Sequence, residues 1–222
     1  CGRCAPTRPA LRSSAWHRTR TVTEFSILFE DGEALVIDKP GGLPLDRPRA
    51  GGPCIEDSLH TLKLGFQRAP VPVHRLDHDT SGCLLLARNP NALRRFSAAF
   101  EARQVEKTYL GLVAGEVAGE AGTIELALTK TSSEQDGWRM VPSPRGKPAT
   151  THWQRLMMKD GITLVRFQPV TGRTHQIRVH ALAGLGAPLL GDPTYGRADP
   201  RVPRTMLHAA ALTVQRGAGK QP

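Results

Sequence analysis

The chain has 222 residues and carries 30 Lys and Arg against 20 Asp and Glu, which gives a formal net charge of +10. This length is enough for one sizeable hydrophobic core, and no apolar stretch is long enough to span a membrane, so a miniature scaffold and a membrane-spanning protein are both excluded. The basic excess, with only 5% aromatic residues, favours a polyanionic partner such as nucleic acid, bound mainly through its phosphates.

The cysteines, Cys1, Cys4, Cys54 and Cys83, are too few and too scattered to form a disulfide framework in a chain of this length. They therefore indicate a reducing compartment, and we expect a cytoplasmic protein. Cys1 and Cys4 have the spacing of half a zinc site, but no second pair of ligands follows them, so we expect no metal.

The N-terminal stretch, residues 1–22, contains five arginines and no acidic residue, and it lacks hydrophobic periodicity. We expect a disordered Arg-rich leader there. Residues 23–222 are then expected to form one folded domain.

The segment 25–40 has two apolar runs on either side of an Asp-Gly pair, which predicts a β-hairpin. A Gly-Gly pair follows it, but no Gly-Lys-Ser/Thr helix start comes next, so a nucleotide cofactor is not expected. Further on, Ile55, Leu59 and Leu62 recur at helical spacing and predict a short helix packed under the sheet.

The segment Val73–Arg88 combines His, Arg and two carboxylates and then becomes wholly apolar. This change predicts a reactive loop that leads into a buried strand over residues 83–87. Asp77 is expected at the mouth of that strand, beside Arg75 and Thr80. An ion-paired structural turn would use the same residue types, so the residues alone leave both interpretations open.

The next elements are a helix and a strand. Asn89 and Pro90 are typical of a helix cap and first turn, and apolar residues at 93, 96 and 100 form a stripe. The arginines at 94, 95 and 103 favour a solvated helix face over RNA contact. Residues 107–113 alternate as in a strand, with Tyr109 on one face, where a lone tyrosine is usually part of the core.

Residues 130–148 are polar and rich in turn formers, so we expect a mobile insertion within the domain. Two strands should follow, in THWQRL and ITLVRFQPV. The stretch Thr171–His180 should begin as a turn and continue as a helix, from which Arg178 projects on a half-apolar face. An arginine in such surroundings needs an anion, and a structural salt bridge would satisfy it.

Several motifs together resemble the RluA family of pseudouridine synthases. HRLDHDTSG, residues 74–82, resembles the segment that carries the catalytic aspartate of that family, and KPGGL, KTYLGLVAG, GRTHQIRVH, GDPTYG and LHA match further family motifs in order. The resemblance implies a mixed α/β (α+β) catalytic domain with a largely antiparallel, bent central sheet flanked by helices, in two lobes around a cleft. The hairpin pattern independently favours antiparallel pairing.

The resemblance also implies roles for individual residues. Asp77 would be the nucleophile, Tyr109 would stand over the target base, and Arg178 would pair with Asp77. Arg75 would insert into the stack vacated by a flipped base. The substrate-binding residues implied in this way are His74, Arg75, Thr80 and Ile177.

The implied reaction is the isomerisation of specific uridines in ribosomal or transfer RNA to pseudouridine, without a cofactor. The oligomeric state stays open, with a monomer slightly favoured. An RNA-binding homologue without catalysis would also fit the charge. A carboxylate hydrolase using Asp77 with Asp79 is disfavoured, because residues two apart on a strand point to opposite faces. A metal site from His74 and His78 is disfavoured by the loop character around them.

Overall fold

The computed structural model describes residues 24–133 and 137–215. The leader expected over residues 1–22 lies outside them. In the described part of the chain, no helix is long and apolar enough to cross a membrane. The elements in chain order are β1 (Ile27–Glu30), β2 (Ala34–Lys39), η1 (Glu56–Lys63), β3 (Val71–Pro72), β4 (Ser81–Ala87), α1 (Pro90–Glu101), β5 (Glu106–Ala114), β6 (Ala121–Glu125), β7 (Leu128–Ser133), β8 (Gly137–Pro142), β9 (Thr150–Lys159), β10 (Ile162–Pro169), α2 (Gln176–Leu185) and β11 (Leu207–Thr213).

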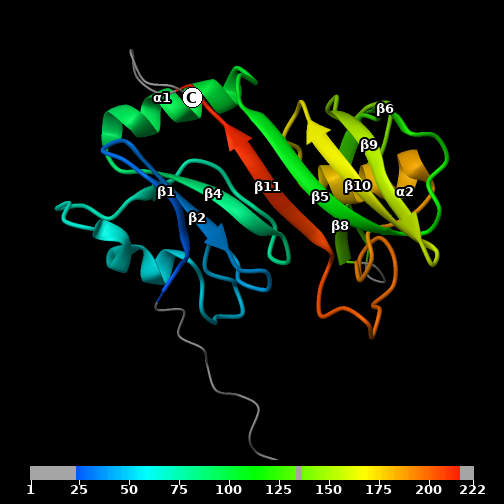
Figure 1. The fold of residues 1–222 in the computed structure, drawn as a ribbon, viewed down its shortest axis with the longest axis horizontal. Coiled ribbons are helices and arrows are strands. Elements are labelled where there is room, and N and C mark those ends of the chain that lie inside the picture. The colour runs from blue at the N-terminus through cyan, green and yellow to red at the C-terminus, as the bar shows by residue number, and fades with distance from the viewer. Residues whose placement is uncertain (1–23, 134–136, 216–222) are drawn as a thin grey trace, which may run out of the picture.

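One large sheet organises the molecule, with the strand order β1-β2-β4-β11-β5-β10-β9-β6 and β3 paired to β4. Among the described residues, neighbouring strands of this sheet pair antiparallel, except for the parallel pair β4 and β11. Figure 1 shows two halves, one around β1, β2 and β4 and the other around β5, β10 and β9, with β11 crossing between them. This mixed, largely antiparallel fold confirms the expected class.

The predicted N-terminal hairpin is present as β1 and β2. Its turn is held by Asp31, whose Oδ1 accepts hydrogen bonds from the backbone N–H groups of Glu33 and Ala34 at 2.8 and 2.7 Å. The predicted buried strand is β4, which lies between β2 and β11. Gly82 on β4 has φ of 107°, and a Cβ there would lie 2.2 Å from the carbonyl oxygen of Ala209. Only glycine therefore allows the close parallel approach of β4 and β11.

Two helices cover opposite faces of the first half of the sheet. On α1, the Asn89 side chain caps the helix by accepting from the Ala92 N–H, and Phe96 is fully buried against the sheet. On the other face lies η1, where Leu59 and Leu62 enter the core. The helix predicted from these leucines exists, but as a 3₁₀ helix.

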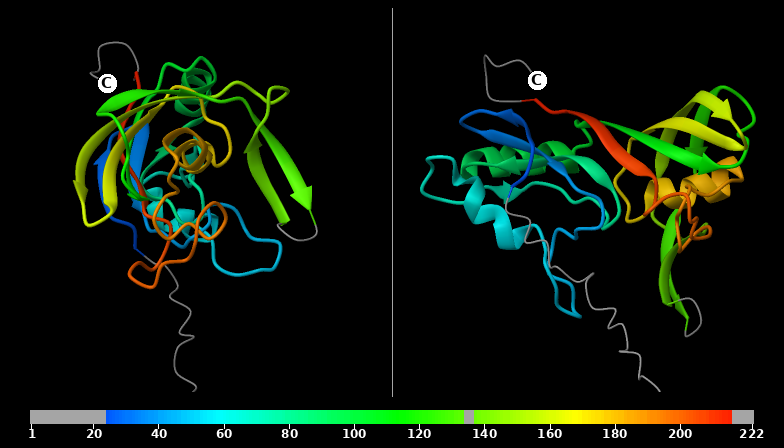
Figure 2. Two further views of the ribbon diagram at one scale, coloured as in Figure 1. Left: turned by 90° about the vertical axis from the view of Figure 1, so that its right-hand side faces the viewer. Right: turned by 60° about the horizontal axis from the view of Figure 1, so that its bottom comes forward.

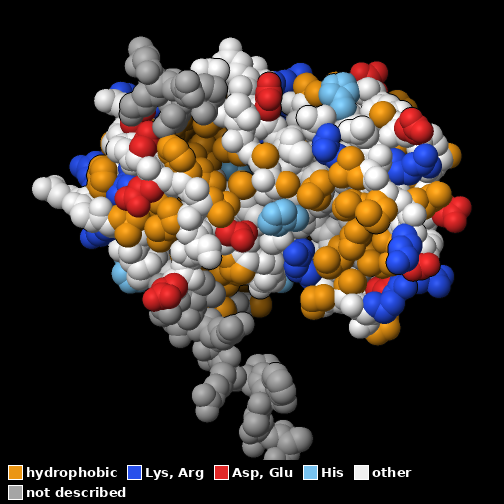
Figure 3. Space-filling model, viewed as in Figure 1, with side chains coloured by type: hydrophobic (Ala, Val, Ile, Leu, Met, Phe, Trp, Pro, Cys, Tyr) orange, Lys and Arg blue, Asp and Glu red, His pale blue; other side chains and the backbone are white. Residues whose placement is uncertain are grey.

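The second half of the sheet is covered on one face by α2. Ile177 and Ala181 of α2 pack in the core with residues of β5 and β10. The helix lies so close to β6 that a Cβ on Gly184 would be 2.7 Å from Ile124, and glycine provides the space for this approach. The face turned toward the viewer in Figure 1 carries exposed apolar side chains over this half, as Figure 3 shows. Leu156, Met157 and Met158 of β9 are exposed, Met157 by 61%.

The polar segment 130–148, expected as a mobile insertion, contains strand pairing that its sequence pattern did not predict. Most of it belongs to a two-stranded hairpin, β7 and β8, whose register runs from Leu128 opposite Pro142 to Ser133 opposite Gly137. The hairpin projects from the body of the molecule in both views of Figure 2. A ribbon exposed on both faces needs no apolar alternation, so its sequence reads like an irregular loop.

Candidate active site

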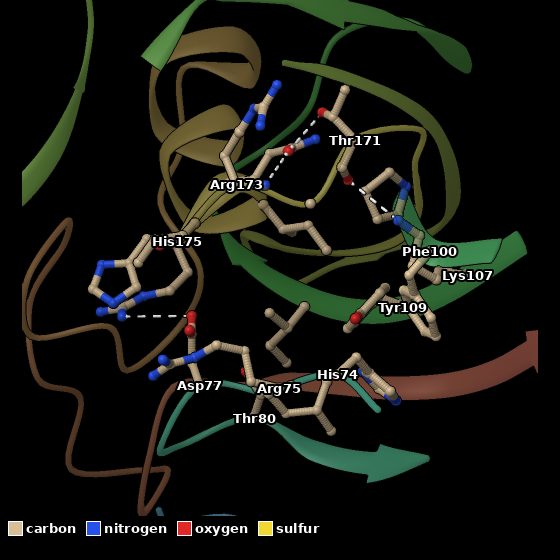
Figure 4. A pocket seen from close by; sticks show the side chains of 18 of the residues that line it. His74, Arg75, Asp77, Thr80, Phe100, Lys107, Tyr109, Thr171, Arg173 and His175 are labelled. Carbon is tan, nitrogen blue, oxygen red and sulfur yellow. Dashed lines mark hydrogen bonds and ion pairs between the residues drawn. The ribbon is translucent and has the colours of Figure 1, made fainter. Parts of the chain in front are cut away.

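A cavity of about 280 Å³ opens where the two halves of the sheet meet. Its walls come from the loop before β4, from β5, and from the turn that leads into α2, as the close view in Figure 4 shows. All seven residues selected from the sequence line it, although they come from three separate segments of the chain: His74, Arg75, Asp77, Thr80, Tyr109, Ile177 and Arg178.

Asp77 occupies the turn before β4 and its side chain remains 25% exposed. The turn is closed by a hydrogen bond of 3.1 Å from the N–H of Thr80 to the carbonyl oxygen of Asp77. Thr80 is buried, and Ser81 begins β4 directly after it. The carboxylate therefore stands at the mouth of the strand and reaches into the cavity (Figure 4).

Arg178 of α2 has a different main partner from the one expected. Its Nε and Nη2 each donate a hydrogen bond of 2.7 Å to the carboxylate of Asp192, whereas Asp77 lies 4.0 Å from Nη1 (Figure 4). The expected pair with Asp77 is present as an ion pair at 4.0 Å, while the hydrogen-bonded partner of Arg178 is Asp192, which the sequence did not predict. A bidentate pair with Asp192 fixes the guanidinium, and its remaining nitrogen faces Asp77.

Asp192 itself is fully buried and also accepts from the backbone N–H groups of Thr194 and Tyr195 at 2.9 and 3.1 Å. Burial would raise the pKa of Asp192, but the hydrogen bonds and charge of Arg178 outweigh this effect and hold the pKa below its usual value. Burial likewise opposes the charge of Arg178, and Asp192 raises the pKa of that guanidinium in return. Both groups are therefore charged, and the attraction between them offsets the cost of burying each charge.

His175 links the start of α2 to the β7–β8 hairpin. Its backbone has φ of 52°, a strained conformation for a residue with a side chain. The ring is held by a 2.9 Å hydrogen bond between Nδ1 and the Tyr195 hydroxyl, and by stacking on Trp138 with ring centroids 4.9 Å apart. The Tyr195 hydroxyl in turn accepts a hydrogen bond from the N–H of Met140 on β8. Burial lowers the pKa of His175, so the neutral ring is favoured.

Gln176, the first residue of α2, ties the turn before the helix to β9. Its side-chain oxygen accepts hydrogen bonds from the Thr171 hydroxyl at 2.7 Å and from the Arg173 N–H at 2.9 Å. Its side-chain nitrogen donates to the carbonyl of Thr150 and the hydroxyl of Thr151. These bonds set where Arg178, less than one helical turn later, enters the cavity.

Tyr109 on β5 forms one wall of the cavity (Figure 4). Burial raises the pKa of Tyr109, and the nearby charge of Asp77 acts in the same direction, so the phenol stays protonated. Next to it, Lys107 donates a 3.3 Å hydrogen bond to the carbonyl of Thr171. Burial lowers the pKa of Lys107. Sequence analysis assigned no role to Lys107, since a lysine in a strand has no distinguishing spacing.

His74 lies beside Tyr109 at the base of the wall. Its ring stacks on Phe100 with centroids 4.8 Å apart and an interplanar angle of 17°. Its Nε2 accepts a hydrogen bond of 3.0 Å from the N–H of Leu85. Burial lowers the pKa of His74 to about 4. The lone pair of its ring nitrogen is thus used to hold β4.

Arg75 extends at the opening of the cavity. Its side chain is 72% exposed, and its nearest carboxylate, that of Asp46, is 3.7 Å away. An exposed ion pair of this length contributes little free energy. The guanidinium can therefore leave Asp46 at small cost when a ligand enters.

The cavity brings together a carboxylate, a cation that faces it, a partly buried phenol and apolar walls. This set can hold a flat polar ring, exclude water from it, and place an anionic oxygen against it. Among residues 24–133 and 137–215, no group of three or more His, Cys, Asp or Glu could hold a metal ion.

Comparison with known proteins agrees with these features. A family model described as RNA pseudouridylate synthase matches residues 33–183. A protein of Zymomonas mobilis named as an uncharacterized RNA pseudouridine synthase is 51% identical over 191 residues, covering 86% of this chain and 87% of that protein. The dual-specificity RNA pseudouridine synthase RluA of Haemophilus ducreyi is 37% identical over 199 residues, covering 84% and 85%.

A solved structure gives the same result for the fold. Human RNA pseudouridylate synthase domain containing 1 superimposes with a TM-score of 0.73 at 32% identity, over 86% of this chain and 79% of that one. Several other curated relatives are longer, and the chain spans about half to two thirds of their length.

Proposed function

This chain belongs to the RNA pseudouridylate synthase family, and from that premise we propose that it converts specific uridines in RNA to pseudouridine with Asp77 as the nucleophile. The observation that carries the assignment of roles is the meeting of Asp77, Tyr109 and Arg178 in one cavity. These residues come from a loop, a strand and a helix, and the cavity is at the small end of ligand pockets, as suits a single nucleoside.

The reaction rearranges one nucleoside without oxidation. The bond between N1 of uracil and C1′ of ribose breaks, the base turns within the cavity, and a bond forms between C5 and C1′. The proton on C5 leaves and N1 ends with a proton, so atoms and charge balance. The Asp77 carboxylate supplies the electron pair that assists bond cleavage, and the apolar walls keep water from the detached base.

Arg178 and Tyr109 support this chemistry in different ways. The Nη1 of Arg178 faces the Asp77 carboxylate and attracts it toward the cavity. Tyr109 offers a flat neutral ring against which the uracil stacks. Ile177 lines the cavity as an apolar contact, and His74 and Thr80 bound the space beside the base.

The target base must leave its helix before it can enter the cavity, at a cost of about a few kcal/mol. Arg75 stands at the opening with its side chain 72% exposed, so it can fill the gap left in the stack. The proposed substrate is ribosomal or transfer RNA. We further propose a monomer in the cytoplasm, where the free thiols of Cys54 and Cys83 stay reduced.

The test is incubation with ribosomal and transfer RNA transcripts that carry tritium on C5 of uracil. The protein should release tritium to water from one of them, and Asp77→Asn should bind that RNA without releasing label. Asp160→Asn, which changes an exposed carboxylate in the turn between β9 and β10, is the matched control and should release label normally. Release of free uracil would indicate a hydrolase, and binding without release by the unaltered protein would indicate an inactive homologue.

A further inference from the structure

The turn that carries Asp77 is held in place by its carbonyl groups. The carbonyl of His78 accepts from the N–H of Gly42 and from Lys39 Nζ, both at 3.0 Å. The carbonyl of Thr80 accepts from the same Lys39 Nζ at 2.9 Å. The carbonyl of Asp79 accepts from Arg204 Nη1 at 2.9 Å. Lys39, Gly42 and Arg204 thus fix the backbone of the turn through its carbonyl groups. The side chain of Asp77 takes no part in these bonds and lines the cavity.

Arg204 donates hydrogen bonds to residues around the start of β11 as well as to the turn that carries Asp77. Besides Asp79, its Nη1 donates to the carbonyls of Thr205 at 2.8 Å and Leu207 at 3.2 Å, and its Nη2 donates to the Ser81 hydroxyl at 2.8 Å. The guanidinium therefore joins the turn before β4 to the start of β11. A lysine could not replace it, because a single ammonium cannot span acceptors in this planar arrangement.

The strand that Arg204 joins to the turn connects the two halves of the site. β11 pairs with β4 on one side, with His208 opposite Ser81, and with β5 on the other, with Ala209 opposite Tyr109. Asp77 belongs to the first half, whereas Tyr109 and Arg178 belong to the second. A shift of the turn relative to β11 would change the distances from Asp77 to both.

Gly41 provides a second, independent sign that the position of Arg204 matters. A Cβ at Gly41 would lie 2.5 Å from both Cδ and Nε of Arg204, and 2.9 Å from the carbonyl oxygen of Asp79. The backbone of Gly41 does not have a positive φ, so glycine is required there for space and not for conformation. The turn and the guanidinium are packed so closely that one methyl group would separate them.

We infer that Arg204 is a positioning residue for Asp77, which sets the distance of the carboxylate from Tyr109 and Arg178 by locking its turn to β11. The inference rests on the proposed function. Arg204 does not line the cavity, so it acts through the turn and not on the substrate. A displacement of about 1 Å at a reacting group can lower a rate by about 10²-fold while binding elsewhere persists.

The experiment measures single-turnover tritium release with enzyme in excess, which separates the rate at saturation from RNA affinity. Arg204→Lys and Gly41→Ala should each lower the saturated rate by about 10²-fold, with the RNA Kd changed by about twofold or less. Gly32→Ala is the matched control, since a Cβ at Gly32 meets nothing within 4 Å and its backbone does not have a positive φ. It should keep the rate.

Rates are compared below the thermal midpoint of each variant, so that a loss of folded protein is not mistaken for a loss of positioning. Arg204→Ala adds a rescue arm: methylguanidinium should restore part of its rate, and methylammonium at equal ionic strength should not. If Arg204→Lys fails to fold, the milder Gly41→Ala decides. An unchanged saturated rate, or a loss confined to Kd, would overturn the inference. Failure of the proposed function would appear separately, as absent release by the unaltered protein.

Discussion

Arg178 donates two hydrogen bonds of 2.7 Å to Asp192 and approaches Asp77 only through Nη1, at 4.0 Å. The two carboxylates therefore do different things for one guanidinium. Asp192 is buried and compensates its charge, while Asp77 is a quarter exposed and meets a cation that is already held in place. The fold can thus stabilise Arg178 without using Asp77, the carboxylate that we propose as the nucleophile.

Stability should separate these two carboxylates. Asp192→Ala should lower the free energy of unfolding by about 3–5 kcal/mol, because it leaves a buried guanidinium without its close partner. Asp77→Ala should cost less than about 1 kcal/mol, since its side chain is partly exposed and its ion pair is long. Urea denaturation of the two variants measures the difference.

A double-mutant cycle provides the control. Removing Asp192 together with Arg178 should cost much less than the sum of the single changes, whereas removing Asp77 with Arg178 should be close to additive. Equal coupling in both cycles would show that Asp77 shares the structural role after all.

Tyr109 should act through its ring. Because burial and the charge of Asp77 raise its pKa, the hydroxyl stays protonated and should add no limb to the pH–rate profile. Tyr109→Phe should keep most activity, while Tyr109→Leu should lose about 1–3 kcal/mol of transition-state stabilisation with the stacked ring. Single-turnover rates of the two variants across pH test this, and an inactive Tyr109→Phe protein would assign the role to the hydroxyl.

Arg75 should matter most when the target base is stacked. Arg75→Ala should lower the rate by about 10-fold or more on a structured RNA and less on a flexible single strand, because only the first needs a gap in the helix to be filled. Arg94→Ala, on the exposed face of α1, is the matched control for loss of one positive charge. Equal losses for Arg75→Ala on both substrates would point to a simple phosphate contact.

His74 should make the stability of the protein depend on pH. Burial lowers its pKa from 6.5 to about 4, so between these values the unfolded chain binds more protons than the folded one. Above about pH 6.5, where His74 is neutral in both states, the free energy of unfolding should be at its full value. It should fall by about 1–3 kcal/mol as the pH falls to about 4. Protonation would also remove the acceptor used by the Leu85 N–H.

His74→Gln removes the titration and can keep an acceptor, so its stability should fall less than that of the unaltered protein between about pH 7.5 and about pH 4.5. Parallel curves for His74→Gln and the unaltered protein would contradict the assignment.

The sequence by itself determined where most elements begin and what the central motifs could do. Apolar periodicity, the Asn89-Pro90 cap and the Asp-Gly turn are local signals, and the free energies behind them depend on neighbours in the chain. The hairpin β7–β8 could not be predicted in this way because both of its faces are largely exposed. Its sequence therefore lacks the alternation of apolar and polar residues that marks a half-buried strand. Its Trp138, 47% exposed, stacks on His175 only because the fold places them together.

Only the tertiary structure decided which charges meet. In the sequence, Asp77, Asp79 and Asp192 are equivalent anions for Arg178, and nothing local distinguishes them. Arg178 pairs with Asp192 because of where α2 and the turn after it pack. A bidentate pair forms only when the guanidinium and the carboxylate lie side by side in matching orientation. The role of Arg204 could not be predicted from the sequence for the same reason. Its hydrogen bonds run to residues about 125 positions earlier in the chain, and only the packing of β11 beside β4 brings those acceptors within reach.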